Sequence, residues 1–331
     1  MFTPVNTSLG ALLLFQGSSG LLLHNGKVFG ISSLLSGCVF NPSLDNLPII
    51  AGLVSSLAPV YWFAPSLIPA YPAAPSSWAS VATTLGLGLL VGWGTKNGRG
   101  CTSGHMLCGL SRLSPRSLIA TCIFFATALL TANFVGGSDL IPACADGSIP
   151  CYTPTYPSTG ELTFMASATA LASITNAVLV PRLLTRSEKS RALFSYLAGV
   201  QFGLGLLIAG MADPAKVIRF FAWLTDPSRF DPSLALIMLF GIGPSLWSFL
   251  SAKPGRPATE GGQEKPTLAE SWSLPTASVA DIDWRFVAGA VAFGLGWGLS
   301  GVCPGPAVLR AVVQPVWGSV WMGGYMLGNL L

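Results

Sequence analysis

Long apolar runs follow one another along nearly the whole chain, and few charged residues separate them. Several of these runs approach the roughly 20 residues that a helix needs to cross the hydrocarbon core of a bilayer. Only 9% of the 331 residues are charged and 51% are hydrophobic, which leaves too little charge for the surface of a soluble protein of this size. The sequence therefore predicts an all-α polytopic membrane domain rather than a soluble domain with an anchor.

The spacing of the runs predicts about nine transmembrane helices, and glycine or proline interrupts several of them. The net charge of +4 is small and the basic residues gather in short loops, which indicates membrane orientation and not nucleic-acid binding. We expect a multi-pass integral protein of the plasma or inner membrane. The predicted apolar segments are 11–23, 28–35, 47–68, 80–94, 118–135, 162–180, 193–211, 234–250, 286–299 and 316–331.

A glycine-rich motif occurs twice, each time at the end of an apolar run. It begins with Gly-Trp-Gly at 92–94 and at 296–298, and each copy continues through glycines to one cysteine, Cys101 or Cys303. Glycines let the backbone turn sharply and approach a ligand, and the amides that open the next helix can face an anion. We therefore expect the function to lie at these two cysteines.

The basic residues predict that the two motifs enter the membrane from opposite sides. The basic loop at 182–191 and the connection at 96–116 are predicted to be cytoplasmic. The loop at 136–160 carries Asp139 and Asp146 but no Lys or Arg, so it is predicted to be external. With about nine crossings, the apolar run before the first motif heads toward the cytoplasm, and the run before the second heads away from it.

Two inverted repeats with re-entrant half-helices follow from this alternation. The first is predicted at 1–191, with its motif at 100–105, and the second at 192–331, with its motif at 301–306. A polar segment at 251–284, rich in Pro, Gly, Glu and Ser, is predicted to be a flexible linker. Inverted repeats with broken helices are a common way to build a transport site near the middle of the bilayer.

Two of the seven cysteines, Cys144 and Cys151, lie in the predicted external loop. A disulfide between them is one interpretation if that loop faces an oxidising side, and two unpaired thiols are the other. The sequence leaves both open.

The residues around the two motif cysteines resemble the YeeE/YedE family of sulfur-compound membrane transporters. The resemblance rests on Gly-Cys-Thr-Ser-Gly-His at 100–105, Cys-Gly-Leu-Ser-Arg at 108–112 and Gly-Val-Cys-Pro-Gly-Pro at 301–306. Characterised bacterial members of that family take up thiosulfate. The resemblance therefore implies a permease and not an enzyme, with the two motif cysteines lining the permeation route.

Thiosulfate is a dianion with a soft terminal sulfur, and a route through hydrocarbon must replace its water with other partners. Helix N-terminal amides can hold its oxygens, and a neutral thiol can donate a weak S–H hydrogen bond to the soft sulfur. We expect Cys101, nearer the cytoplasm, and Cys303, nearer the outside, to act as successive relay points. The candidate substrate-binding residues are Cys101, Thr102, Ser103, Gly104, His105, Cys108, Cys303, Pro304 and Gly305.

Four basic residues are candidates for charges at the entrances. Lys27 and Lys216 occupy similar places in the two halves, and Arg112 and Arg310 each follow a cysteine motif. These cations either draw an anion toward the route or anchor helix ends at the membrane interface.

Two alternatives to thiosulfate uptake remain. One is transport of another sulfur or selenium compound, and the other is a membrane enzyme that exchanges persulfide or disulfide between the two thiols. The enzyme needs electron carriers, and the sequence shows no Cys-x-x-Cys, haem or flavin signature and no metal-ligand spacing. We therefore expect no cofactor and no metal, and we leave open the coupling ion and whether a soluble sulfur-carrier protein receives the cargo.

Overall fold

The computed structural model places residues 1–331, and we describe all of them except 136–139, 145–148 and 258–260. Asp139 and Asp146 of the predicted external loop lie outside the described residues. The regular elements, in chain order, are α1 (Pro4–Asn25), α2 (Ile31–Phe40), α3 (Leu47–Ser55), α4 (Leu57–Phe63), η1 (Pro65–Leu67), α5 (Trp78–Asn97), η2 (Ser103–Leu110), α6 (Pro115–Leu130), η3 (Thr131–Val135), α7 (Thr159–Ile174), η5 (Thr175–Leu179), α8 (Val180–Leu183), α9 (Glu188–Ile208), α10 (Pro214–Arg219), η6 (Pro227–Arg229), η7 (Pro232–Ala235), η8 (Met238–Ile242), α11 (Gly243–Ala252), η10 (Val279–Asp281), α12 (Trp284–Ser300), α13 (Pro304–Val313) and α14 (Pro315–Leu330). The prediction of an all-helical fold is confirmed for the described residues.

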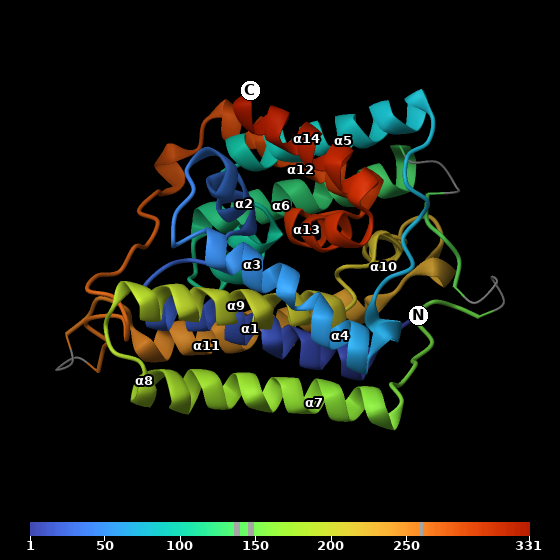
Figure 1. Cartoon of the computed structure of the whole chain (residues 1–331). Coiled ribbons are helices and arrows are strands. Elements are labelled where there is room, and N and C mark those ends of the chain that lie inside the picture. Colours follow the sequence, from blue (N-terminus) through green and yellow to red (C-terminus); the bar gives the residue numbers. More distant parts are fainter. Residues whose placement is uncertain (136–139, 145–148, 258–260) are drawn as a thin grey trace.

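The long helices lie side by side in two groups (Figure 1). One group contains α5, α6, α12 and α14, and the other contains α1, α3, α7, α9 and α11. Each group draws helices from both halves of the chain, so the two halves interlock. The short helix α13 lies between the groups and contacts α14 on one side and α3 and α9 on the other.

Glycines bring partner helices into backbone contact, as is usual for helices that pack in membranes. On the seam between α5 and α12, Gly94 faces Phe293 and Gly98 faces Gly289. As the residue numbers rise along α5, those of the facing residues on α12 fall, so the two helices are antiparallel. The seam between α1 and α9 is built in the same way. The helices that lead to Cys101 and Cys303 therefore run in opposite directions.

Four long helices each end in a turn that leads to a short helix. The pairs are α1 with α2, α5 with η2, α9 with α10 and α12 with α13, and we call the short members half-helices. Gly26 and Gly301 end α1 and α12 with φ of 70° and 66°, in the left-handed region where a Cβ is strained. The axes of α12 and α13 differ by 40°. Where an apolar run of the sequence is interrupted, the structure thus has a turn that directs a short helix toward the interior of the protein.

Within the described residues, four helical stretches are long and apolar enough to cross a membrane, and a fifth is added if α12 and α13 count as one bent span. This is fewer than the predicted nine. The helices α1 and α5 are 22 and 20 residues long, but glycine and hydroxyl residues lower their hydropathy. The stretches that pass are Pro115–Val135, Thr159–Leu183, Glu188–Ile208 and Pro232–Ala252.

The seam between α5 and α14 leaves no room for a side chain at Gly92. A Cβ on Gly92 would lie 2.1 Å from Tyr325 O. We expect Gly92→Val to force these helices apart and to lower the free energy of unfolding by about 1–3 kcal/mol, measured by thermal unfolding in detergent. Gly86 of the same helix faces open space, so Gly86→Val is the control. An equal loss in both variants would contradict this account of the seam.

The described part of the predicted external loop packs against the N-terminus. Of the two interpretations, the structure has the disulfide, which joins Cys144 to Cys151. Phe2 N donates to Cys151 O, Thr155 N donates to Phe2 O, and Cys151 N donates to Ser228 O. The disulfide thus fixes a contact point between the N-terminus and the loop that follows α10.

We expect Cys144→Ser to lower the free energy of unfolding by about 2 kcal/mol, because the short loop closed by the disulfide gains entropy in the unfolded chain. Thermal unfolding with and without a thiol reductant measures this. The reductant should lower the stability of the wild type and leave the variant unchanged. Cys122→Ser, at a free and exposed cysteine, is the control. A reductant effect that persists in Cys144→Ser would show that the disulfide is not its source.

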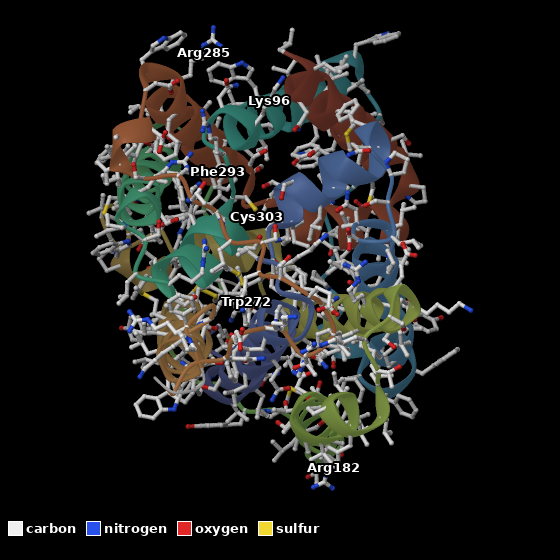
Figure 2. All side chains as sticks on the ribbon, turned by 90° about the vertical axis from the view of Figure 1, so that its left-hand side faces the viewer. Lys96, Arg182, Trp272, Arg285, Phe293 and Cys303 are labelled. Atoms are coloured by element: carbon white, nitrogen blue, oxygen red, sulfur yellow. A yellow bond between two sulfur atoms is a disulfide. The ribbon has the colours of Figure 1, made fainter. Side chains whose placement is uncertain are left out.

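The polar segment 251–284 packs on the end of α1 over part of its length. Thr267 N donates to Leu23 O, Leu268 N donates to His24 O, and the Leu268 side chain is 2% exposed. These backbone bonds hold the segment in place, so it is not a freely moving linker over these residues. Viewed from this end of the molecule in Figure 2, Trp272 of the segment lies over the middle of the helix bundle.

Candidate functional site

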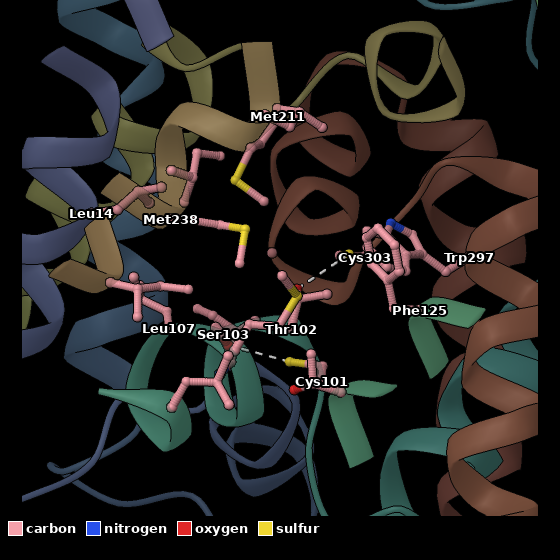
Figure 3. A pocket seen from close by; sticks show the side chains of 18 of the residues that line it. Leu14, Cys101, Thr102, Ser103, Leu107, Phe125, Met211, Met238, Trp297 and Cys303 are labelled. Atoms are coloured by element: carbon pink, nitrogen blue, oxygen red, sulfur yellow. Dashed lines mark hydrogen bonds between the residues drawn. The ribbon is translucent and has the colours of Figure 1, made fainter. Parts of the chain in front are cut away.

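A cavity of about 380 Å³ lies where three half-helices meet, and we call it the apolar chamber. Residues at the starts of α2, η2 and α13 line it, together with apolar side chains from α6, α9 and η8 (Figure 3). Both motif cysteines border it and both are buried. No charged residue is among its described lining residues. The candidate residues that the structure brings to this chamber are Cys101, Thr102, Ser103, Cys303 and Gly305.

Hydrogen bonds tie the starts of the three half-helices together. Thr102 Oγ1 donates to Cys303 Sγ at 3.4 Å, and Ser103 Oγ lies 3.2 Å from Cys101 Sγ (dashed lines in Figure 3). The N–H of Ile31, at the start of α2, donates to Ser103 Oγ at 3.1 Å. The first backbone N–H groups of a helix have no partner within it. Ser103 Oγ accepts from that of Ile31, and in α13 the prolines at 304 and 306 leave Gly305 as the residue with an N–H among the first three.

Cys303 occupies its place because the chain is extended between α12 and α13. The left-handed turn at Gly301 ends α12, and Cys303 then caps α13 with extended φ and ψ of −92° and 163°. Pro304 follows as the first residue of α13, where its missing N–H does no harm. In Figure 2, Cys303 lies near the middle of the bundle, whereas Lys96 and Arg182 lie toward its outside.

A second cavity of about 930 Å³ lies on the other face of η2, and we call it the basic vestibule. Gly104 and His105 border the vestibule and not the chamber, so η2 separates the two spaces. No Asp or Glu is among the described lining residues of the vestibule. Its basic residues are Lys27, Lys96, Arg99, Arg112 and Arg116.

His105 is buried and both of its ring nitrogens have partners. Because a carbonyl oxygen only accepts, Nε2–H donates to Gly98 O at 2.9 Å. Nδ1 lies 3.2 Å from Ser117 Oγ. His105 therefore joins the start of η2 to the end of α5 and the beginning of α6.

Cys108 does not border the apolar chamber. Its Sγ donates to Phe29 O at 3.2 Å, and it lines a small polar cavity of about 10 Å³ together with Arg112. Arg112 Nε also donates to Cys108 O at 2.9 Å. The helix η2 is a π-helix, in which seven residues make less than two turns, so Cys108 does not share the face of Cys101.

The other candidate charges lie in three different settings. Lys27 lines the vestibule and forms an ion pair with Asp45. Lys216 is buried, and its Nζ lies 2.9 Å from Asp231 Oδ2. Arg310 lies over an aromatic ring of α14, with its guanidinium carbon 4.1 Å from the ring centroid. Lys216 and Arg310 are not among the described lining residues of either cavity.

Two polar residues of the chamber were not predicted from the sequence. Trp297 and Thr121 both line it, and Trp297 Nε1 and Thr121 Oγ1 are buried without a hydrogen-bond partner among the described atoms. Trp297 belongs to the Gly-Trp-Gly repeat, but it was not among the candidate substrate-binding residues. Nothing in the sequence around Thr121 indicates more than a position in an apolar helix.

The fold and the chamber define a helical, multi-pass membrane protein whose site is built from half-helices. Residues 191–326 match the model of a family described as "Family of unknown function (DUF6691)". Over 130 residues the chain is 40% identical to a probable transporter of Xylella fastidiosa strain Temecula1, which covers 39% of this chain and 92% of that relative. Another probable transporter, from Xylella fastidiosa strain 9a5c, is 40% identical over 111 residues, which make up 34% of this chain and 68% of the relative. The chain belongs to the family of these probable transporters.

Proposed function

We propose that the protein is a membrane permease that takes up a sulfur-containing anion, with thiosulfate as the substrate. The observation that carries the proposal is that Cys101 and Cys303, both buried, border one chamber, at half-helix starts reached from antiparallel helices. The relatives named as probable transporters support transport. The resemblance of the motifs to the YeeE/YedE family suggests thiosulfate among sulfur compounds.

We further propose that the chain consists of two inverted repeats, 1–191 and 192–331. Helices related by a two-fold axis in the membrane plane must be antiparallel, as α5 is to α12 and α1 is to α9. The repeat matches α1 with α9, α3 with α11, α5 with α12 and α6 with α14. Under this matching, the contact of α5 with α14 corresponds to that of α12 with α6, and the contact of α3 with α9 corresponds to that of α11 with α1. This symmetry of contacts supports the repeat.

The same architecture gives about nine crossings. Four of them are the apolar stretches named above. The other five are α1, α3 with α4, α5, α12 and α14. Most residues of α1 and more than half of α12 are buried against other helices, so their glycines and polar side chains are kept from lipid. Hydropathy alone undercounts spans of this kind.

The two cavities suit successive stages of anion movement. The basic vestibule lies among loops predicted to be cytoplasmic, and its cations attract an anion that leaves the chamber. In the chamber, a neutral thiol donates a weak S–H hydrogen bond to the soft sulfur and releases it readily. The protein thus holds thiosulfate by Cys303, passes it to Cys101 and delivers it toward the vestibule, across the plasma or inner membrane.

Exchange of labelled thiosulfate in liposomes tests the proposal without knowledge of the coupling ion. Liposomes with purified protein are loaded with unlabelled thiosulfate, and entry of the labelled ion from outside is followed. We expect saturable entry that external thiosulfate blocks and sulfate does not, because sulfate lacks the soft sulfur. Protein-free liposomes are the control, and entry no faster than theirs would refute the proposal.

A further inference from the structure

Two hydrogen-bond donors in the apolar chamber have no partner within the described residues. Trp297 is 4% exposed, and its Nε1–H is buried and unpaired. Thr121 Oγ1 is buried and unpaired as well. A buried donor without a partner costs about 1–3 kcal/mol, so each of these atoms needs an explanation. Both residues line the chamber, so a ligand in it can supply the missing acceptors once small side-chain shifts uncover the two donor atoms.

The Trp297 ring is held in a fixed orientation. It stacks on Phe293 with an interplanar angle of 5°, and it is perpendicular to Phe221 at a centroid distance of 4.9 Å. Phe124 packs against a further edge of the ring. In Figure 3 the indole nitrogen lies on the side of the ring nearest Cys303 in that view. A donor fixed in this way binds an acceptor without first losing rotational freedom.

The two donors lie at different depths of the chamber. Gly294 of α12 faces Phe124 of α6, and Gly298 faces Ala128, so these helices run parallel and in register. By that register Trp297 lies beside residue 127, six residues beyond Thr121, which is about 9 Å along the helix axis. Thr121 is on the part of α6 nearer the vestibule, and Trp297 is on the part of α12 that leads to Cys303. The two donors are therefore spaced along the helix direction and do not lie side by side.

We propose that the Trp297 indole N–H binds an oxygen of the transported anion while its sulfur faces Cys303, and that the Thr121 hydroxyl binds an oxygen at the next position. This inference rests on the proposed function and narrows its substrate class. The site selects an anion that carries both a soft sulfur and hydrogen-bond-accepting oxygen. The described lining of the chamber contains no cation, so neutral hydrogen-bond donors stabilise the negative charge of the anion.

The thiosulfate concentration dependence of exchange in Trp297→Phe liposomes tests this inference. Phenylalanine keeps an aromatic ring at the Phe293 stack and removes the N–H. We expect KM for thiosulfate to rise about tenfold or more, with a smaller change in the maximal rate, because a hydrogen bond to a charged acceptor is lost. Thr121→Val, which keeps the side-chain shape, should raise KM in the same direction.

Trp321→Phe is the matched control. Trp321 Nε1 is also buried and unpaired among the described atoms, but Trp321 is not among the described residues that line the chamber. Its KM should stay at the wild-type value. If the Trp297 N–H instead faces the Phe221 ring, Trp297→Phe will lower the unfolding temperature and leave KM unchanged, which would overturn the inference. Should Trp297→Phe fail to fold, an unchanged KM in Thr121→Val would overturn it. Absence of exchange by the wild type would refute the permease itself and the inference with it.

Discussion

Replacing Cys101 and Cys303 together by alanine is expected to lower thiosulfate exchange about a hundredfold, and each single replacement about tenfold. In the proposed mechanism each thiol supplies one S–H donor to the soft sulfur, and one hydrogen bond is worth up to about a factor of ten. Initial rates in liposomes at equal protein content measure the effect. Near-wild-type rates in both single variants would contradict a role for the thiols in transport.

Cys122→Ala is the control for the cysteine variants. Cys122 also borders the chamber, but it is exposed and lies within α6, not at a half-helix start. Its replacement should leave the rate unchanged. Mass spectrometry of the intact protein after turnover separates hydrogen bonding from persulfide exchange. Hydrogen bonding leaves Cys101 and Cys303 unmodified, whereas persulfide exchange adds the mass of sulfur to one of them.

Lys216→Met is expected to lower the free energy of unfolding by about 3–5 kcal/mol. The Asp231 side chain is fully buried, and its Oδ2 lies 2.9 Å from Lys216 Nζ. The Met1 ammonium is a weaker neighbour at 3.6 Å, and burial lowers the pKa of that ammonium against the opposing effect of Asp231. Removing Lys216 therefore leaves a buried carboxylate without its closest counter-charge. Chemical denaturation in detergent measures the loss.

Lys27→Met is the matched control for this ion pair. Lys27 and its partner Asp45 are each more than a third exposed, so the loss there should be at most about 1 kcal/mol. The double variant Lys216→Met with Asp231→Leu should recover part of the stability, because it leaves no charge of the pair behind. An equal loss at Lys216 and Lys27 would show that burial does not govern the strength of the pair.

The turn that brings Cys303 to the apolar chamber could be predicted because its information is local. Gly301, Cys303 and Pro304 occur in one short string that specifies a turn, a cap and a helix start. The setting of Lys216 could not be predicted in this way, because its partner Asp231 lies 15 residues further along and the pairing depends on tertiary packing. The sequence therefore presented Lys216 as a charge available at an entrance, whereas the structure places it in an ion pair.

Two other differences have geometric causes. Cys108 was predicted to bind substrate together with Cys101, and the wider turn of η2 places it at another cavity. Trp297 was not among the predicted substrate-binding residues. It packs against Phe293, and the unpaired nitrogen at its edge depends on surroundings that no local pattern specifies.

The lining of the apolar chamber has a consequence for the leak of ions across the membrane. A hydrated sodium ion or a proton that enters a space without charged walls loses most of its solvation and gains little in return. Such a space therefore disfavours the entry of small cations. In the proposed permease, this lining lets the soft-ended anion pass while it opposes a leak of cations that would discharge the membrane potential.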